Sequence, residues 1–141
     1  MTSLDPHQPF ELEIAVCPDD IDLLDHVNNV IYLRWVQDAA VAHWVAAAND
    51  EEKAALLWVV VRHEIDYKRP ATAADVVIAR TWVGEADQRT FERHTEIIRK
   101  RDNKLLARAR TLWRPIDAVS RHPIAVDEQV YQRFSSNHAS S

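Results

Sequence analysis

The stretch NVIYLRWVQDAAVAHWVAAA, residues 29–48, constrains the fold of this chain more than any other segment. It contains neither glycine nor proline, and its only clear polar stripe consists of Arg34, Gln37 and Asp38, so it predicts one long helix. A helix that is apolar around most of its circumference has to be covered by other protein on most sides. We therefore expect the rest of the chain to wrap around residues 29–48.

Segments of alternating apolar and polar residues supply this covering. Strands are predicted at residues 10–17, 57–68, 75–83, 90–100 and 104–114, and a short helix or turn at DEEKAALL. Asp102 and Asn103 are residue types that tolerate the left-handed conformation, and they predict a tight hairpin turn. The order of elements predicts an α+β domain in which a curled antiparallel β-sheet of about five strands wraps around a long central helix.

Two of these strands are predicted to have one dry and one wet face. In the strand at 57–68 the interior face comprises Val59, Val61, His63, Ile65 and Tyr67, and the solvent face comprises Arg62, Glu64, Asp66 and Lys68. In the strand at 104–114 the interior face comprises Leu105, Ala107, Ala109, Thr111 and Trp113, and the solvent face comprises Arg108, Arg110 and Arg114. The sheet is therefore expected to bury one face against the helix.

Size and composition limit the class of protein. The 141 residues are expected to form a single domain over 1–141, with SSNHASS at 135–141 as a flexible tail. A hydrophobic fraction of 47% with five tryptophans excludes disorder, and no apolar run approaches the roughly 20 residues of a membrane-spanning helix. The net charge of −5 argues against general affinity for nucleic acids, so neither nucleic acid nor membrane is an expected partner.

The N-terminus MTSLDPHQPFELEIAV carries acids and a proline where an export signal has a basic start and an apolar block. Cys17 is the only cysteine, so the chain forms no internal disulfide, which agrees with a reducing compartment. These two features lead us to expect a cytoplasmic protein.

The loop before the predicted helix, DIDLLDHVNN at residues 20–29, concentrates polar side chains at the helix N-terminus. Asn28 or Asn29 is expected to cap the helix. Free amides at such a terminus stabilise negative charge that develops on a carbonyl oxygen. A carboxylate close by can deprotonate water or attack the carbonyl itself, and a thiolate is a good leaving group. The loop therefore suits hydrolysis of an activated carbonyl compound, of which a thioester is one.

The chain resembles a known family in the order of its elements and in two segments. These segments are DIDLLDHVNNVIYLRW and VVVRHEIDYKRPATAADVVIARTWV. They resemble the hotdog-fold acyl-CoA thioesterases of the 4-hydroxybenzoyl-CoA thioesterase type. The pattern D...HVNN..Y is also similar to that of plant acyl-carrier-protein thioesterases. The resemblance spans roughly residues 10–134. It implies a hotdog fold, hydrolysis of an acyl-CoA or acyl-carrier-protein thioester, no cofactor beyond the coenzyme A of the substrate, and a homodimer or homotetramer.

The resemblance also implies roles for individual residues. Asp22 takes the position of the catalytic carboxylate, as general base or nucleophile, and the helix amides near Asn29 take that of the oxyanion donor. His26 matches the histidine of the plant-type motif, either as an acid or base or as a structural residue. The residues expected to bind substrate or coenzyme A are Asn28, Tyr32, His63, Lys68, Arg89 and Thr90. Two positions depart from the pattern, because Leu24 replaces an asparagine of the plant enzymes and Asp25 replaces a glycine of many relatives.

Several alternatives stand beside this interpretation. A hotdog hydratase or dehydratase has a motif similar to D-x-N-P-x-H, whereas this chain has DLLDH, without the asparagine or the proline. A non-catalytic module that binds acyl-CoA or acyl-carrier protein would use the same cleft without turnover. A metal site at Asp22, Asp25 and His26 is not expected, because no second histidine follows at helical spacing and there is no cysteine pair. His63 also fits a hydrogen-bonded core histidine, and Lys68 a solvent-facing charge.

Overall fold

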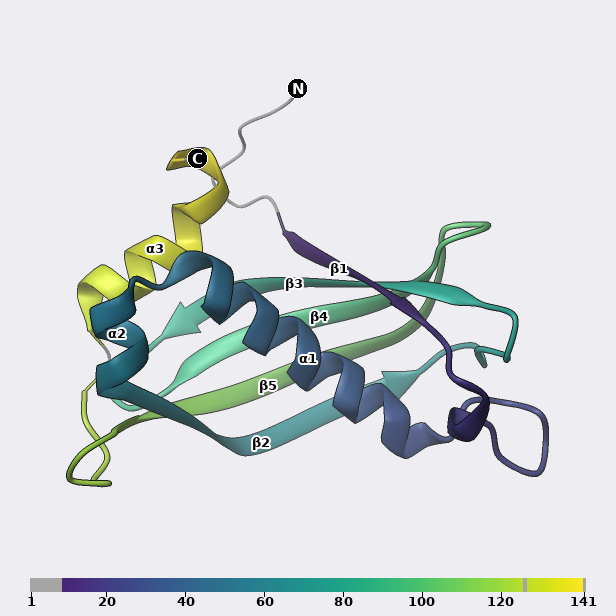
Figure 1. Cartoon of the computed structure of the whole chain (residues 1–141), viewed down its shortest axis with the longest axis horizontal. Helices are drawn as coiled ribbons and strands as arrows, with labels where there is room; N and C mark the ends of the chain where they lie inside the picture. Colours follow the sequence, from purple (N-terminus) through teal and green to yellow (C-terminus); the bar gives the residue numbers. More distant parts are fainter. Residues whose placement is uncertain (1–8, 126, 141) are drawn as a thin grey trace.

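The computed structural model describes residues 9–125 and 127–140 of the chain. Its elements, in chain order, are β1 (Phe10–Ala15), a 3-10 turn (Pro18–Asp20), α1 (Asn29–Ala47), α2 (Asp50–Ala55), β2 (Leu56–Tyr67), β3 (Val76–Ala86), β4 (Phe91–Arg99), β5 (Lys104–Asp117) and α3 (Glu128–Ser140). The strands pair antiparallel in one sheet of order β1-β3-β4-β5-β2 (Figure 1). This is the predicted α+β arrangement, with each strand within a few residues of its predicted bounds.

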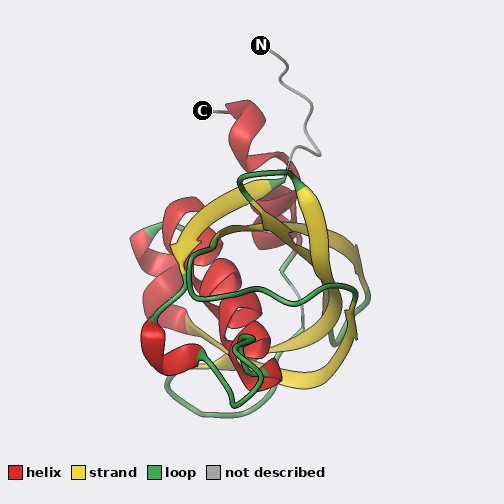
Figure 2. Cartoon of the chain, turned by 90° about the vertical axis from the view of Figure 1, so that its right-hand side faces the viewer, coloured by secondary structure: helices red, strands yellow, loops and turns green. Residues whose placement is uncertain are grey.

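Helix α1 lies in the curl of the sheet, and Figure 2 shows the strands arching around it. Its buried residues recur at helical spacing and share one face; they are Tyr32, Trp35, Val36, Ala39, Ala40 and His43. The sheet contributes Val77, Ala79, Ile97, Ala107 and Ala109 to the same core. Burial of this apolar face against the sheet is what fixes the position of α1.

The expectation that α1 is covered on most sides is wrong for a single chain. Val30 is 65% exposed, and Val41 and Val45 are each 56% exposed, on the side of α1 that faces away from the sheet. The near-continuous apolar circumference read from the sequence therefore divides into a buried face and an uncovered one.

The predicted face assignment of β2 is also wrong in its first half. The register of β2 against β5 shifts between Val60 and Arg62, so one residue is inserted there. Because side chains alternate with a period of two, a one-residue insertion moves the preceding side chains to the opposite face. Val59 and Val61, predicted to be interior, are 44% and 47% exposed. Beyond the bulge, His63 and Ile65 are half-buried, as predicted.

Strand β5 follows its prediction more closely. Ala107, Ala109 and Thr111 are buried and Arg108 is exposed. The register with β4 shifts next to the predicted turn, so Leu106 rather than Leu105 is fully buried. The turn itself is confirmed, because Asn103 has a φ of 60° and its amide donates to the carbonyl of Arg99 at 2.7 Å.

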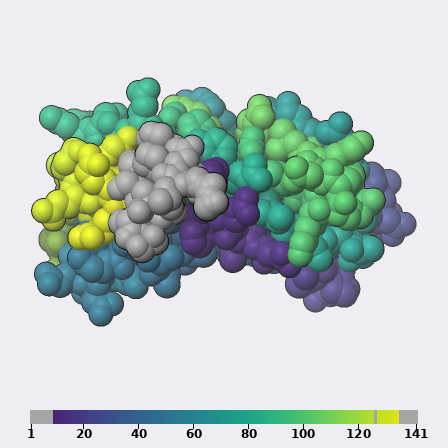
Figure 3. Space-filling model, turned by 90° about the horizontal axis from the view of Figure 1, so that it is seen from above, coloured from purple at the N-terminus to yellow at the C-terminus, as the bar shows by residue number. Residues whose placement is uncertain are grey.

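Helix α3 was not anticipated from the sequence. It packs beside α1, and its Val130 and Phe134 are buried in a second apolar cluster with Leu56 and Phe91. The hydroxyl of Tyr131 donates to the carbonyl of Gly84 at 3.0 Å, which ties α3 to β3. Seen from above, α3 lies at one end of an elongated molecule and the loop before α1 at the other (Figure 3). The backbone of α3 continues to Ser140. The flexible tail that we expected at 135–141 stays a prediction, and residue 141 lies outside the described part of the chain.

Candidate active site

The loop that connects β1 to α1 is held at its base by Asp20, which is only 3% exposed. The Asp20 carboxylate accepts hydrogen bonds from the amide of Cys17 and from Nη2 of Arg34, each at 3.0 Å. Its carbonyl accepts from the amide of Asn28 at 2.8 Å. Through its carboxylate and its carbonyl, this buried residue bonds both ends of the loop and a helix side chain, and so fixes where the loop begins and ends. The sequence analysis did not single out Asp20 for this role.

Asp22 lies at the exposed turn of this loop. Its Oδ1 accepts from the amide of Leu24 at 2.9 Å and from that of His26 at 3.3 Å. Its own amide donates to the carbonyl of His26 at 2.8 Å, and Ile21 and Val27 form a β-bridge just beyond. One carboxylate oxygen therefore shapes the turn, as short polar side chains commonly do.

Asp25 has a φ of 60°, in the left-handed region. Glycine enters this region without steric cost, and aspartate tolerates it better than most other residues. The conformation therefore suits the glycine that the resemblance leads us to expect here, and it also accepts the aspartate of this chain.

The N-terminus of α1 is capped by Asn28, as predicted. Its Oδ1 accepts from the amide of Val30 at 3.1 Å, and its carbonyl accepts from the amide of Ile31 at 2.9 Å. These bonds leave the amide of Asn29 without an acceptor among the residues described here. The first helical amide is thus available to a ligand, at the positive end of the helix dipole.

An open cleft of about 420 Å³ lies against this N-terminus. It brings together six of the residues singled out from the sequence: Asp22, His26, Asn28, Asn29, Tyr32 and Lys68. The rest of its lining comes from Leu24 and Val27 of the loop and from Tyr67, Arg69 and Pro70, at the end of β2 and just beyond it. Tyr67 was predicted to be interior, but it is 41% exposed, and its hydroxyl donates to the carbonyl of Asn29 at 3.2 Å. The cleft therefore joins a carboxylate, a helix N-terminus and two basic side chains.

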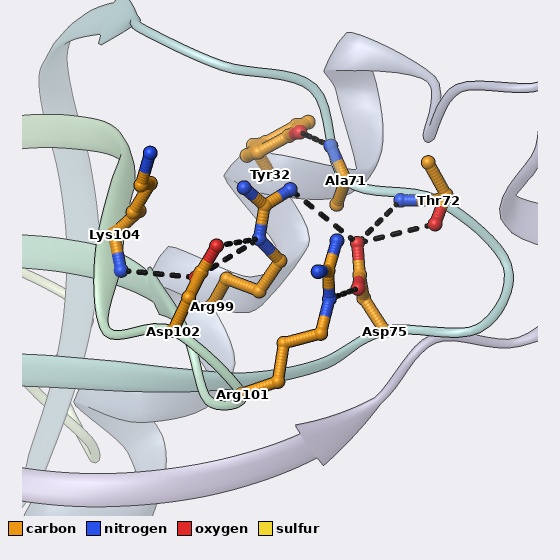
Figure 4. A network of polar contacts seen from close by, with 8 residues as sticks. All are labelled: Tyr32, Ala71, Thr72, Asp75, Arg99, Arg101, Asp102 and Lys104. Atoms are coloured by element: carbon orange, nitrogen blue, oxygen red, sulfur yellow. Dashed lines mark hydrogen bonds and ion pairs between the residues drawn. The ribbon is translucent and has the colours of Figure 1, made fainter.

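Residues 68–70 form one wall of the cleft, and the segment that continues from them to residue 75 is fixed by a network of polar contacts (Figure 4). The amide of Ala71 donates to the hydroxyl of Tyr32 at 2.9 Å, and burial raises the pKa of Tyr32. Asp75 accepts from the amide of Thr72 at 2.9 Å and from Nε of Arg101 at 3.2 Å. Burial alone raises the pKa of Asp75, but these hydrogen bonds outweigh it and leave the pKa below its ordinary value. The wall is thus anchored by a buried, ionised carboxylate.

Three residues singled out from the sequence lie outside this cleft. Nδ1 of His63 is hydrogen-bonded to Oγ1 of Thr111 at 2.9 Å, and burial lowers the pKa of His63, as in the core-histidine alternative. Arg89 and Thr90 lie in the turn between β3 and β4, at the end of the molecule that carries α3 (Figure 1). Their amides donate to Oδ1 of Asp87 at 2.7 and 2.8 Å. Within one chain they do not reach the cleft.

Within residues 9–125 and 127–140, no cluster of three or more histidine, cysteine, aspartate or glutamate side chains has the arrangement of a metal site. None of the helices in the same residues combines the length and the hydropathy needed to cross a membrane.

Comparison with known proteins gives a family match over most of the chain. A family model described as the thioesterase-like superfamily matches residues 16–134, which include the whole cleft and most of α3. No curated protein sequence gives a significant match.

Three solved structures illustrate the structural likeness. The YbaW probable thioesterase from Escherichia coli is 21% identical, with a TM-score of 0.75 over 90% of this chain and 97% of that one. A 1,4-dihydroxy-2-naphthoyl-CoA thioesterase from Synechocystis is 23% identical, with a TM-score of 0.73 over 88% and 93% of the two chains. A Staphylococcus aureus protein solved in complex with CoA is 14% identical, with a TM-score of 0.78 over 95% and 85%. These likenesses confirm the predicted hotdog fold.

Proposed function

The chain belongs to the thioesterase-like superfamily, and on this premise we propose that it hydrolyses acyl-CoA thioesters in the cleft at the N-terminus of α1. The observation that carries the proposal is that Asp22 and the N-terminus of α1 line the same open cleft. A carboxylate and a helix N-terminal amide are the two groups that the hydrolysis of a thioester requires.

The amide of Asn29 is the proposed oxyanion donor. The partial positive charge at the start of α1 favours the negative charge that develops on the thioester oxygen as the carbonyl carbon becomes tetrahedral. Because the Asn28 side chain already satisfies the amide of Val30, the amide of Asn29 is left to bind that oxygen. The electrophilic role therefore falls to a backbone N–H group, which only a substitution by proline would remove.

Asp22 is the proposed base or nucleophile. As a base it takes a proton from water, whose oxygen attacks the carbonyl carbon; the carbon–sulfur bond then breaks and coenzyme A leaves as the thiolate. As a nucleophile its carboxylate attacks instead, the thiolate leaves, and water hydrolyses the resulting anhydride. His26, which also lines the cleft, is within the same loop and serves either as an acid or base or as part of the turn.

The basic wall opposite Asp22 supports coenzyme A as the thiol carrier. Lys68 and Arg69 are exposed at the mouth of the cleft, next to each other in the chain. Positive side chains at this place match the phosphates of coenzyme A. A relative of similar fold was solved in complex with CoA, and another is named for an aromatic acyl-CoA substrate. Carrier-protein thioesters are the competing substrate class.

We also propose that the working unit is a homodimer or a dimer of dimers. Strand β2 is an edge of the sheet, and its Leu57, Val59 and Val61 are all more than a third exposed. An edge strand with free backbone groups and exposed aliphatic side chains is a surface that a second copy of the chain can cover. The uncovered face of α1 offers further apolar area for the same purpose.

One observation favours a second candidate function. Oδ1 of Asp22 is engaged with the loop backbone, which is also what a purely structural turn aspartate does. In that case the cleft would bind an acyl-CoA without hydrolysing it.

Thiol release from a panel of acyl-CoA and acyl-carrier-protein thioesters separates the two functions. The proposal expects catalytic turnover of at least one acyl-CoA, above its turnover of the matching carrier-protein thioester. Binding of acyl-CoA with no thiol release from any member of the panel would favour the binding module instead.

A further inference from the structure

A second cavity, of about 60 Å³, lies at the far end of α1 from the cleft. Trp44 of α1, Trp58 of β2 and Trp113 of β5 line it, together with Phe134 of α3 and Arg93 of β4. Val41 also lines it and is 56% exposed, so the cavity opens beside the uncovered face of α1. Since one water needs roughly 10–15 Å³, the space accommodates the terminal few atoms of a larger ligand.

Arg93 is the unusual member of this lining, because it is a charged side chain that is only 5% exposed. Its Nη1 donates to Oγ1 of Thr81 at 3.1 Å and lies 3.0 Å from Nδ1 of His43. Because a guanidinium has no acceptor, Nδ1 of His43 must accept this hydrogen bond, so the imidazole is neutral. The Arg93 guanidinium also lies over the ring of Phe134, 5.2 Å from its centroid.

None of these partners carries a negative charge. Among the described residues, no carboxylate lies within 4.0 Å of the Arg93 guanidinium, whereas many surface arginines of this chain have one. Burial lowers the pKa of Arg93 only to about 10, so the side chain is still protonated at neutral pH. A buried positive charge without a counterion is costly and is normally paired.

Most of the lining is apolar. The rings of Trp58 and Trp113 line the cavity, but their indole Nε1 atoms are buried and are not accessible from it. Arg93 is therefore the charged group that this aromatic and aliphatic lining presents to a ligand.

We propose that this cavity binds the carboxylate end of an apolar ligand, with Arg93 as the cationic partner and the aromatic lining around the adjoining carbons. The ligand is either the distal end of the acyl group of a thioester or a free carboxylic acid. Asn29 and Val41 are twelve residues apart on α1, or about 18 Å at 1.5 Å per residue, a span that a long acyl chain covers. Binding of the carboxylate stands without the proposed function, and only its assignment to an acyl group rests on that function.

The binding test is titration calorimetry with decanoate, and with decanol as the uncharged ligand of the same length. The wild-type protein should bind decanoate at least about tenfold more tightly than decanol, because a charge-assisted hydrogen bond is formed in a dry site. Arg93→Met should remove this difference. Arg108→Met is the matched control, since Arg108 is exposed on β5 and far from the cavity lining. Equal affinity for the two ligands in the wild type, or an unchanged preference in Arg93→Met, would overturn the proposal.

Ala40→Leu keeps the test decisive if Arg93→Met does not fold. Ala40 lines the cavity, so the larger side chain should fill it while Arg93 stays in place, and decanoate affinity should fall several-fold. An unchanged affinity for decanoate in Ala40→Leu would count against the site.

The source of the carboxylate is decided by turnover. If the cavity takes the distal end of the substrate, an acyl-CoA with an ω-carboxylate should have a higher kcat/KM than its methyl-terminated counterpart, and Arg93→Met should abolish the preference. If the two thioesters are hydrolysed alike, the ligand is a free acid. A protein that hydrolyses no thioester but still binds decanoate through Arg93 would contradict the proposed function and leave this site intact.

Discussion

The hydroxyl of Tyr32, on α1, accepts a hydrogen bond from the backbone amide of Ala71 at 2.9 Å, in a part of the structure where both residues are buried. The carbonyl of Ala71 accepts from the amide of Val27 at 2.8 Å. The amide and the carbonyl of Ala71 thus join the segment after β2 to α1 and to the loop that carries Asp22. These two hydrogen bonds hold the three segments that form the cleft in one arrangement.

Tyr32→Phe should test the hydrogen bond between Tyr32 and Ala71. The substitution keeps the ring and removes the acceptor of a buried amide, which typically costs about 1–3 kcal/mol of unfolding free energy. The cleft loop should also loosen, so kcat should fall by more than the loss of folded protein explains. Urea denaturation and thiol-release kinetics on the same preparation measure the two effects.

Tyr131→Phe is the matched control for Tyr32→Phe. It removes a hydroxyl that donates to the carbonyl of Gly84 at 3.0 Å, at the other end of the molecule. Stability should fall, but the activity of the folded protein should be kept. Equal effects of the two substitutions on kcat would mean that the Tyr32 contact only stabilises the fold.

Asp25 should be replaceable by glycine but not by valine. Its φ of 60° is freely accessible to glycine and strongly disfavoured for a β-branched residue. We expect Asp25→Gly to keep both stability and turnover, and Asp25→Val to lower turnover by distorting the turn that Asp22 shapes. Steady-state kinetics of the two variants check this, and a marked loss of activity in Asp25→Gly would instead assign the Asp25 carboxylate a chemical role.

Asp75 should make the stability of the protein depend on pH. Its pKa in the folded state is held below the ordinary value of 3.8, so the unfolded state binds the proton more tightly. The stabilisation is therefore fully present above pH 3.8 and is lost as the pH falls through the folded-state pKa. Asp75→Asn should be less stable than the wild type at neutral pH, and the difference should shrink in acid. Urea midpoints near pH 7 and pH 3 measure it, with Asp66→Asn on the exposed face of β2 as the control.

Val59→Lys should test the proposed assembly. A charge placed on the exposed edge strand β2 should prevent a second copy from packing there. Light scattering should then give the 16.2 kDa monomer for Val59→Lys and a multiple of it for the wild type and for Ala74→Lys, an exposed loop control. A wild-type protein that is active as a monomer would contradict the proposed dimer.

The parts of the fold that follow from local patterns could be read from the sequence. The long helix, the turn at Asp102 and Asn103 and the cap at Asn28 all depend on residues adjacent in the chain. The bulge in β2 could not be predicted from the sequence. The extra residue, Val61, lies in a continuous run of apolar residues, so no break in the pattern marks it. Helix α3 was missed because it has few apolar residues, and these pack in a cluster with residues that are distant in the sequence.

The candidate site divides in the same way. The loop contains several aspartates, and the sequence alone does not tell which of them is buried. Asp20 is distinguished by Arg34, which lies fourteen positions further along and reaches back from α1 to bond it. Tyr67 and Arg69 enter the cleft because β2 ends beside the start of α1, which is a matter of topology rather than of motif.

Thiol release by Asp22→Asn tests the central claim most directly. Asparagine retains an Oδ1 acceptor for the amide of Leu24, so the turn should persist while the carboxylate is lost. We expect turnover to fall about a hundredfold or more, with the unfolding free energy changed by only about 0.5 kcal/mol and acyl-CoA binding kept. Asp19→Asn, exposed in the same loop, should behave as the wild type. Wild-type turnover by Asp22→Asn on every thioester that the parent hydrolyses would contradict the assignment of this cleft as the catalytic site.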